Sequence, residues 1–251
     1  MSLDAKNQWE TSLINYNNYI NYITTVLSDD TKFNNFRNTN DPGYTAILEH
    51  VDQNMGKVYF DEIKKNVSDL ENYIKIAKEN DTIGSPLIYD YDAFSINPTT
   101  LRYLKYAIEI KQTFSDIKNI NYVEVGAGYG GLCKILNTLC NFNSINFFDL
   151  PEALELQRKY LSNFDIFVNK LNILDDLIIQ KNTLFVSNYA LSELNHQTRR
   201  MYMDKVISKC KYAFIVSNNE NFTKELLTEF NANLSHDCLD RCSIVTIKNL
   251  N

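Results

Sequence analysis

The stretch Val123-Glu124-Val125-Gly126-Ala127-Gly128-Tyr129-Gly130-Gly131 decides the fold of this chain. The chain has 251 residues and only seven glycines, and four of those glycines lie within this stretch. Glycine lets the backbone approach a ligand closely and adopt angles that other residues avoid. A short apolar run that ends in clustered glycines predicts a strand, a tight turn and a helix. We therefore expect a ligand site at the carboxyl end of this strand, as in doubly wound sheets.

Strand and helix patterns alternate from this stretch to the C-terminus. They predict strands at 122–125, 144–148, 165–168, 183–187 and 212–216, helices at 132–140, 152–161, 174–179, 198–209 and 222–230, and a final hairpin of strands 233–238 and 242–247. Such alternation indicates a parallel sheet with right-handed crossovers. The hairpin requires one strand that runs antiparallel to its neighbour.

The N-terminal part predicts helices. Apolar residues recur at helical spacing from Trp9 to Leu27, and the same spacing predicts helices at 47–55, 63–77 and 97–110. A polar turn at 39–43 and a loop at 81–98 separate them, and Asn97 or Thr99 is the expected N-cap of the last helix. The chain thus divides into a helical region, 1–117, and a sheet domain, 118–251.

Composition excludes several classes of function. Lys and Arg total 25 and Asp and Glu total 31, giving a net charge of −6. This disfavours binding to a nucleic-acid polymer through its phosphates. No run of about 18 apolar residues predicts a membrane span. The five cysteines are scattered without a CxxC pair, so neither a disulfide framework nor a zinc site is expected, and a cytoplasmic location fits best.

Two cofactor classes use such a glycine turn. Dinucleotide sites need G-x-G-x-x-G and an acid about 20 residues later, and Gly126, Gly128, Gly131 and Asp149 fit that spacing. S-adenosylmethionine (SAM) sites have an acid two residues before the first of three alternating glycines, a position that Glu124 fills. SAM carries an ammonium and a sulfonium and no pyrophosphate, so an acidic site suits its charge better. A tight turn without a ligand is the structural alternative.

The glycine stretch, together with Phe148-Asp149-Leu150-Pro151, resembles class I SAM-dependent methyltransferases. Three further segments resemble a family of sugar O-methyltransferases: Ile83-Gly84-Ser85-Pro86, Pro98-Thr99-Thr100-Leu101-Arg102-Tyr103, and Ser187-Asn188-Tyr189-Ala190-Leu191-Ser192-Glu193-Leu194. The resemblance implies an α/β, Rossmann-like, seven-stranded sheet whose last strand is antiparallel, with an N-terminal helical extension. It also implies methyl transfer from SAM to a hydroxyl of a sugar, or of a sugar-linked precursor of a surface polysaccharide such as a capsule.

The expected cofactor contacts come from the glycine loop and from the ends of neighbouring strands. Asp149 would bind the ribose hydroxyls, with a helix-capping role before Pro151 as the alternative, and Asn172 would contact the adenine. The full set is Glu124, Gly126, Ala127, Gly128, Tyr129, Gly130, Asp149, Leu150, Asn172 and Asn188.

Methyl transfer to oxygen requires a base that removes the hydroxyl proton. The loop after the fourth predicted strand offers Tyr189, Glu193 and His196 as catalytic residues. Histidine is a residue type that can act as a base near neutral pH, but His196 begins a polar stretch that is typical of a surface helix. Glu193 is a base or a sugar-hydroxyl ligand, unless it is only a first-turn carboxylate. Tyr189 is expected against the cofactor, with core packing as the alternative.

Arg102, Tyr103 and Arg199 are the expected acceptor-binding residues, because arginine binds phosphate or carboxylate bidentately. Solvated helix faces are the alternative for both arginines. No metal is expected, because the tandem acids at 175–176 fit the face of a short helix. His50 is expected on a helix surface and His236 in a structural role.

The expected partner is a small carbohydrate, free or nucleotide-linked, and a homo-oligomer is compatible with the sequence. Two other functions stay open at this point. An NAD-dependent sugar oxidoreductase or epimerase would normally show Tyr-x-x-x-Lys, and neither Tyr160 nor Tyr202 is followed by such a lysine. A non-catalytic, methyltransferase-like scaffold would not need both Glu124 and Asp149.

Overall fold

The computed structural model describes residues 13–45, 47–170, 179–239 and 242–249. Asn172 and most of the predicted helix 174–179 lie outside the described residues. Within the described residues, no helix is both long enough and apolar enough to cross a membrane.

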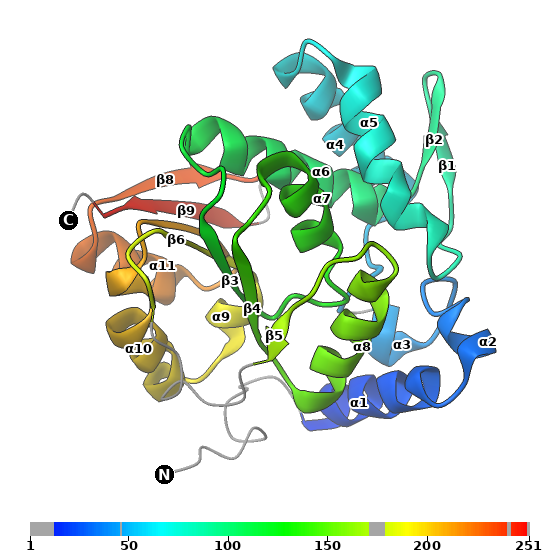
Figure 1. The fold of residues 1–251 in the computed structure, drawn as a ribbon, viewed down its shortest axis with the longest axis horizontal. Coiled ribbons are helices and arrows are strands. Elements are labelled where there is room, and N and C mark those ends of the chain that lie inside the picture. The colour runs from blue at the N-terminus through cyan, green and yellow to red at the C-terminus, as the bar shows by residue number, and fades with distance from the viewer. Residues whose placement is uncertain (1–12, 46, 171–178, 240–241, 250–251) are drawn as a thin grey trace.

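The domain is built on a mostly parallel sheet with the strand order β5-β4-β3-β6-β7-β9-β8 (Figure 1). The sheet consists of six strands of five or six residues and the two-residue β5. In chain order the strands are β3 (Asn121–Val125), β4 (Ser144–Phe148), β5 (Asn169–Lys170), β6 (Thr183–Asn188), β7 (Tyr212–Ser217), β8 (Ala232–His236) and β9 (Ser243–Lys248). β9 runs antiparallel to both β7 and β8. The predicted α/β fold with a mostly parallel sheet is therefore confirmed, and so is the C-terminal hairpin.

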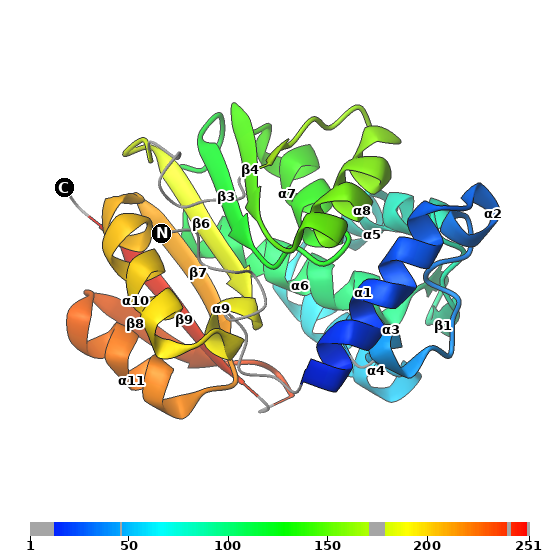
Figure 2. The same cartoon turned by 90° about the horizontal axis from the view of Figure 1, so that it is seen from below.

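Two helical layers cover the sheet. The helices α9 (Ala190–Glu193), α10 (His196–Lys205) and α11 (Glu220–Glu229) pack on one face, and α6 (Pro98–Thr113), α7 (Gly131–Cys140) and α8 (Pro151–Ser162) pack on the other (Figure 2). Successive side chains of β3 point to opposite faces of the sheet and therefore contribute to two separate hydrophobic cores. Val123 and Val125 point into the first layer, whereas Tyr122 and Glu124 point into the second.

The N-terminal helices lie beyond α6 and α8 and extend that second layer (Figure 2). They are α1 (Leu13–Leu27), α2 (Asp30–Phe33), α3 (Pro42–Thr45), α4 (Gln53–Asn66) and α5 (Leu70–Lys78), followed by a 3₁₀ turn at Glu79–Thr82 and a hairpin of β1 (Tyr89–Tyr91) and β2 (Phe94–Ile96). α1 packs against α8 and α4 packs against α6. The helical character predicted for this region is confirmed, and so is the N-cap of α6, where Asn97 accepts a hydrogen bond of 3.0 Å from the Thr100 amide.

Two N-terminal predictions are wrong in their boundaries. Residues 47–49 form turns, and the helix begins only at Gln53, because the Asp52 carboxylate accepts a hydrogen bond from the Met55 amide at 2.8 Å. The single helix predicted at 63–77 is split, because Asp69 caps a new helix by accepting from the Asn72 amide at 3.2 Å. The predicted loop at 81–98 contains the β1–β2 hairpin.

Two boundaries in the sheet domain are also wrong. The strand predicted at 165–168 is displaced to Asn169–Lys170, because Asp165 adopts a left-handed φ of 55° in a turn. The helix predicted at 198–209 begins at His196, where Asn195 caps it by accepting from the Thr198 amide at 2.9 Å. A 3₁₀ turn at Ile207–Lys209 follows it.

Candidate functional site

The glycine loop joins β3 to α7 at the carboxyl edge of the sheet. Gly126, Gly128 and Gly130 have φ angles of 70°, 60° and 97°, in the left-handed region that favours glycine. A side chain at Gly126 would collide with the Ala190 methyl of α9, and a Cβ at Gly128 would lie 2.6 Å from Leu48 Cδ2. The loop therefore requires glycine both for its backbone angles and for the close approach of its neighbours.

Asp149 lies directly after β4, beside this loop. Its carboxylate accepts hydrogen bonds from its neighbour, the Leu150 amide, at 2.8 Å and from Gln157 Nε2 at 2.7 Å. Gln157 also donates to the Gly128 carbonyl at 3.0 Å and so holds the carboxylate against the loop. Burial raises the pKa of Asp149 to about 6. A half-buried acceptor at a strand end can bind vicinal hydroxyls.

Glu124 is more deeply buried, with 1% of its surface exposed. The Tyr122 hydroxyl donates to its Oε2 at 2.7 Å, and burial raises the pKa of Glu124 to about 8. Asp149 adds to that rise through like-charge repulsion. Since a nearby cation would favour the ionised form of both acids, the pair is electrostatically suited to a positively charged ligand.

The N-terminal region covers the glycine loop. Leu48 contacts Gly128, and Tyr103 of α6 packs edge-on against Tyr129 with ring centroids 5.8 Å apart. The Arg37 guanidinium lies over the Tyr129 ring, 4.7 Å from its centre. The loop is thus enclosed by residues from well before the sheet domain.

Arg37 is a central residue that the sequence analysis missed. It is 2% exposed and forms ion pairs with Glu49 at 2.6 Å and Asp81 at 3.4 Å. It also donates to the Asn80 carbonyl at 2.7 Å and to Asn97 Oδ1 at 3.0 Å. These bonds join the N-terminal helices to the start of α6. Sequence gives no signal for this role, because the hydrogen-bond partners of Arg37 lie 12 to 63 residues away.

The segment after β6 carries backbone strain. Tyr189 has φ 69° and ψ −41°, an unfavourable combination for a residue other than glycine, and its amide donates to the Val216 carbonyl at 3.0 Å. Ser187 holds the following turn by accepting from the Leu191 amide at 2.9 Å. Asn188 Oδ1 is buried and has no hydrogen-bond partner among the residues that the structure describes. Strain and an unpaired acceptor at a strand end are typical of a ligand site.

The three predicted catalytic residues have different surroundings. Glu193 is half-buried, bonds to Asn218, and burial raises the pKa of its carboxyl. The Tyr189 hydroxyl donates to Cys242 Sγ at 3.4 Å, and burial raises the pKa of its phenol, which keeps it protonated. The His196 side chain is 71% exposed, 3.8 Å from Glu225 of α11. The geometry brings Tyr189 and Glu193 into one turn and leaves His196 at the surface.

The predicted acceptor-binding residues are separated. Arg102 and Tyr103 are buried neighbours on α6. Arg199 of α10 is also buried and donates to the carbonyls of Ser192 and Leu194 at 3.3 and 2.6 Å, so it caps the end of α9. Because Arg102 and Arg199 are both buried, the alternative prediction that they lie on solvated helix faces is wrong.

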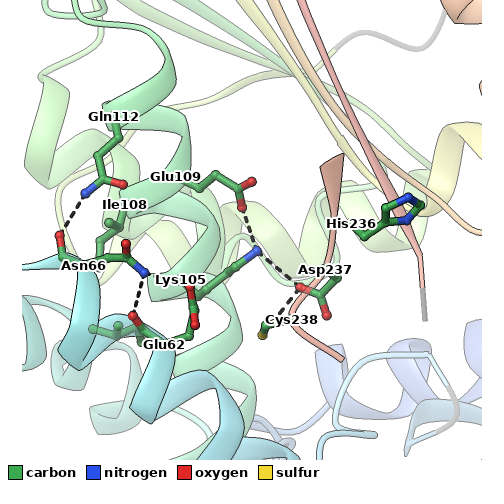
Figure 3. A pocket seen from close by; sticks show the side chains of 10 residues that line it. Glu62, Asn66, Lys105, Ile108, Glu109, Gln112, His236, Asp237 and Cys238 are labelled. Atoms are coloured by element: carbon green, nitrogen blue, oxygen red, sulfur yellow. Dashed lines mark hydrogen bonds and ion pairs between the residues drawn. The ribbon is translucent and has the colours of Figure 1, made fainter. Parts of the chain in front are cut away.

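A separate pocket of about 540 Å³ lies between α4, α6 and β8 (Figure 3). Its cation, Lys105, is paired with Glu109 at 2.7 Å and Asp237 at 3.3 Å. No residue of the glycine loop lines it. Among the described residues, no group of three or more side chains is arranged to hold a metal ion.

Comparison with known proteins gives matches among solved structures alone. No family model matches the chain, and no curated protein does. An Aquifex aeolicus SAM-dependent methyltransferase is 11% identical (TM-score 0.46, 56% of this chain and 88% of that chain). TrmK of M. capricolum, in complex with S-adenosylhomocysteine (SAH), is 12% identical (0.43, 57% and 68%). Human N-acetylserotonin methyltransferase, in complex with SAM, is 11% identical (0.45, 59% and 53%).

Proposed function

We propose that the protein is a SAM-dependent O-methyltransferase that acts on a hydroxyl of a sugar or of a sugar-linked precursor of a surface polysaccharide. One observation carries the proposal: a loop of three left-handed glycines lies between two acids, the buried Glu124 and the half-buried Asp149. A diphosphate would meet two carboxylates there, whereas the ammonium and sulfonium of SAM would be attracted by them.

The residues present fit SAM. Asp149 would accept from the ribose hydroxyls, and the backbone of Ala127, Gly128 and Tyr129 would line the amino-acid end near Glu124. Gly126, Gly130, Leu150 and Asn172 complete the proposed cofactor set. The unpaired Asn188 Oδ1 is an acceptor that a ligand donor would satisfy. When bound, SAM supplies an electrophilic methyl group on sulfur.

The proposed base is Glu193. A neutral hydroxyl is a weak nucleophile, and a half-buried carboxylate with a raised pKa removes its proton more readily than an ordinary one. Tyr189, whose phenol stays protonated, would instead position the acceptor or the cofactor. His196 and Arg199 stay predictions that their surroundings do not support, because His196 is exposed and Arg199 bonds to α9. The proposal includes a cytoplasmic location, a carbohydrate partner and the use of residues 1–117 as a cover for the site.

Isothermal titration tests the cofactor. We expect SAH to bind and NAD not to bind. Asp149→Asn should weaken SAH binding by about 10- to 150-fold, the range for a lost hydrogen bond to a charged group. Asp61→Asn, which removes an exposed carboxylate on α4, is the matched control and should leave the affinity unchanged. Binding of NAD without binding of SAH would contradict the proposal.

A further inference from the structure

Four basic side chains are buried around α6 and α7, and one of them lacks an acid. Arg37, Lys105 and Lys134 each form an ion pair with at least one carboxylate. Arg102 is 3% exposed and forms no ion pair with any residue in the described part of the chain. Burying an unpaired charge is unfavourable. The difference is sharp within α6 itself, because Lys105, one turn after Arg102, has two carboxylate partners.

The hydrogen bonding of Arg102 is also incomplete. Its Nη1 lies 2.6 Å from Nε2 of His50, and its Nε is buried without a hydrogen-bond partner in the described part of the chain. A guanidinium can only donate, so Nε2 of His50 is the acceptor in this contact. The His50 side chain is exposed. An exposed residue therefore covers a buried guanidinium that still has a donor to satisfy.

Aromatic side chains from the helical region and from the sheet domain surround Arg102. Its guanidinium carbon lies 5.4 Å from the centre of the Tyr103 ring, and the phenols of Tyr106, Tyr189 and Tyr59 also act on it electrostatically. Tyr189 follows β6, and Tyr106 packs on Phe214 of β7 with ring centroids 6.0 Å apart. Asp149 follows β4, on the other side of β3 in the sheet order. A ligand at Arg102 would thus lie near Tyr189 and also near Tyr103, which packs on Tyr129 of the glycine loop.

We propose that Arg102 binds an anionic group, a carboxylate or a phosphate, carried by the methyl acceptor. The inference rests on the proposed function for the identity of the acceptor. The planar guanidinium matches either anion with two parallel hydrogen bonds, and the aromatic surroundings weaken screening by water. The unpaired Nε and the adjacent Nη2, whose N–H groups point to the same side of the guanidinium, would supply the two donors, and Nη1 can keep its contact with His50.

Titration of paired sugars tests this inference. Glucuronate and glucose 1-phosphate are the anionic probes and glucose is the neutral one, each added to the full-length protein with and without saturating SAH. We expect at least one of the two anionic sugars to bind at least tenfold more tightly than glucose. Arg102→Met should abolish that preference while SAH affinity stays unchanged. Arg200→Met, at a partly exposed arginine of α10, is the control for loss of one positive charge and should keep the preference.

The outcomes separate the inference from the proposed function. Equal binding of glucose and both anions to the wild type overturns the inference without any variant, so misfolding of Arg102→Met cannot hide a failure. A preference that survives Arg102→Met also overturns it. Loss of SAH affinity in Arg102→Met would assign the anion to the cofactor's carboxylate and overturn the acceptor site. Absence of SAH binding to the wild type, with the anion preference intact, would instead remove the methyltransferase proposal.

Discussion

Replacing Glu124 with glutamine is expected to stabilise the ligand-free protein, and to do so increasingly as the pH rises. The Glu124 carboxyl is 1% exposed, and burial raises its pKa from an ordinary value of 4.5 to about 8. Below pH 4.5 the carboxyl is protonated in both the folded and the unfolded chain. Between pH 4.5 and about pH 8 the Glu124 carboxyl ionises in the unfolded chain but not in the folded protein, so stability is lost as the pH rises. Glutamine removes this linkage and keeps an oxygen that accepts from Tyr122.

The magnitude follows from the two pKa values. Each pKa unit corresponds to about 1.4 kcal/mol, and the destabilising contribution of Glu124 is then about 1 kcal/mol at pH 5, about 3 at pH 7 and about 4 at pH 8. The free energy of unfolding of Glu124→Gln, relative to that of the wild type, should rise by about 2 kcal/mol between pH 5 and pH 7. Asp149 titrates in both proteins and largely cancels in the difference.

Urea unfolding at a series of pH values measures this difference. Glu71→Gln, which removes an exposed carboxylate on α5, is the control and should give a difference that hardly changes with pH. A Glu124→Gln difference that is constant from pH 5 to pH 8, or that falls, would refute the assignment of a protonated buried acid beneath the glycine loop. If the acid serves a cationic ligand, the same substitution should weaken the binding of SAM, which carries the sulfonium, although it strengthens the fold.

Three further substitutions test other parts of the structure. Arg37→Met leaves two carboxylates buried without their cation and should lower the free energy of unfolding by about 3–5 kcal/mol; a loss below about 1 kcal/mol would contradict the central role of this residue. Gly128→Ala should destabilise the fold by about 1–3 kcal/mol through its positive φ and its collision with Leu48, and Leu48→Ala in the same chain should recover only the steric part. In an assay with labelled SAM across nucleotide sugars, Glu193→Gln should lower kcat by about 10²- to 10⁴-fold, whereas an unchanged kcat would exclude Glu193 as the base.

Much of the sheet domain could be predicted from sequence because its signals are local. The run 144–148 alternates and ends at Asp149, and the strand of that range is reproduced residue for residue. The glycine stretch predicted a strand, a turn and a helix, and all three are present. Errors arose where a single capping residue overrides an apolar period, as at Asp52 and Asp69.

The sequence by itself determined the α/β fold and the place of a loop that only glycine can form, since φ preferences and hydrophobic period act over a few residues. Tertiary structure alone decided which charges are buried together. It paired Arg37 with Glu49 and Asp81, and it placed Arg102 against His50 with no acidic partner among the described residues. It also raised the pKa of Glu124, because removal from water depends on every residue packed around the carboxyl. Such long-range pairings and the burial they produce leave no trace in the spacing of residues along the chain.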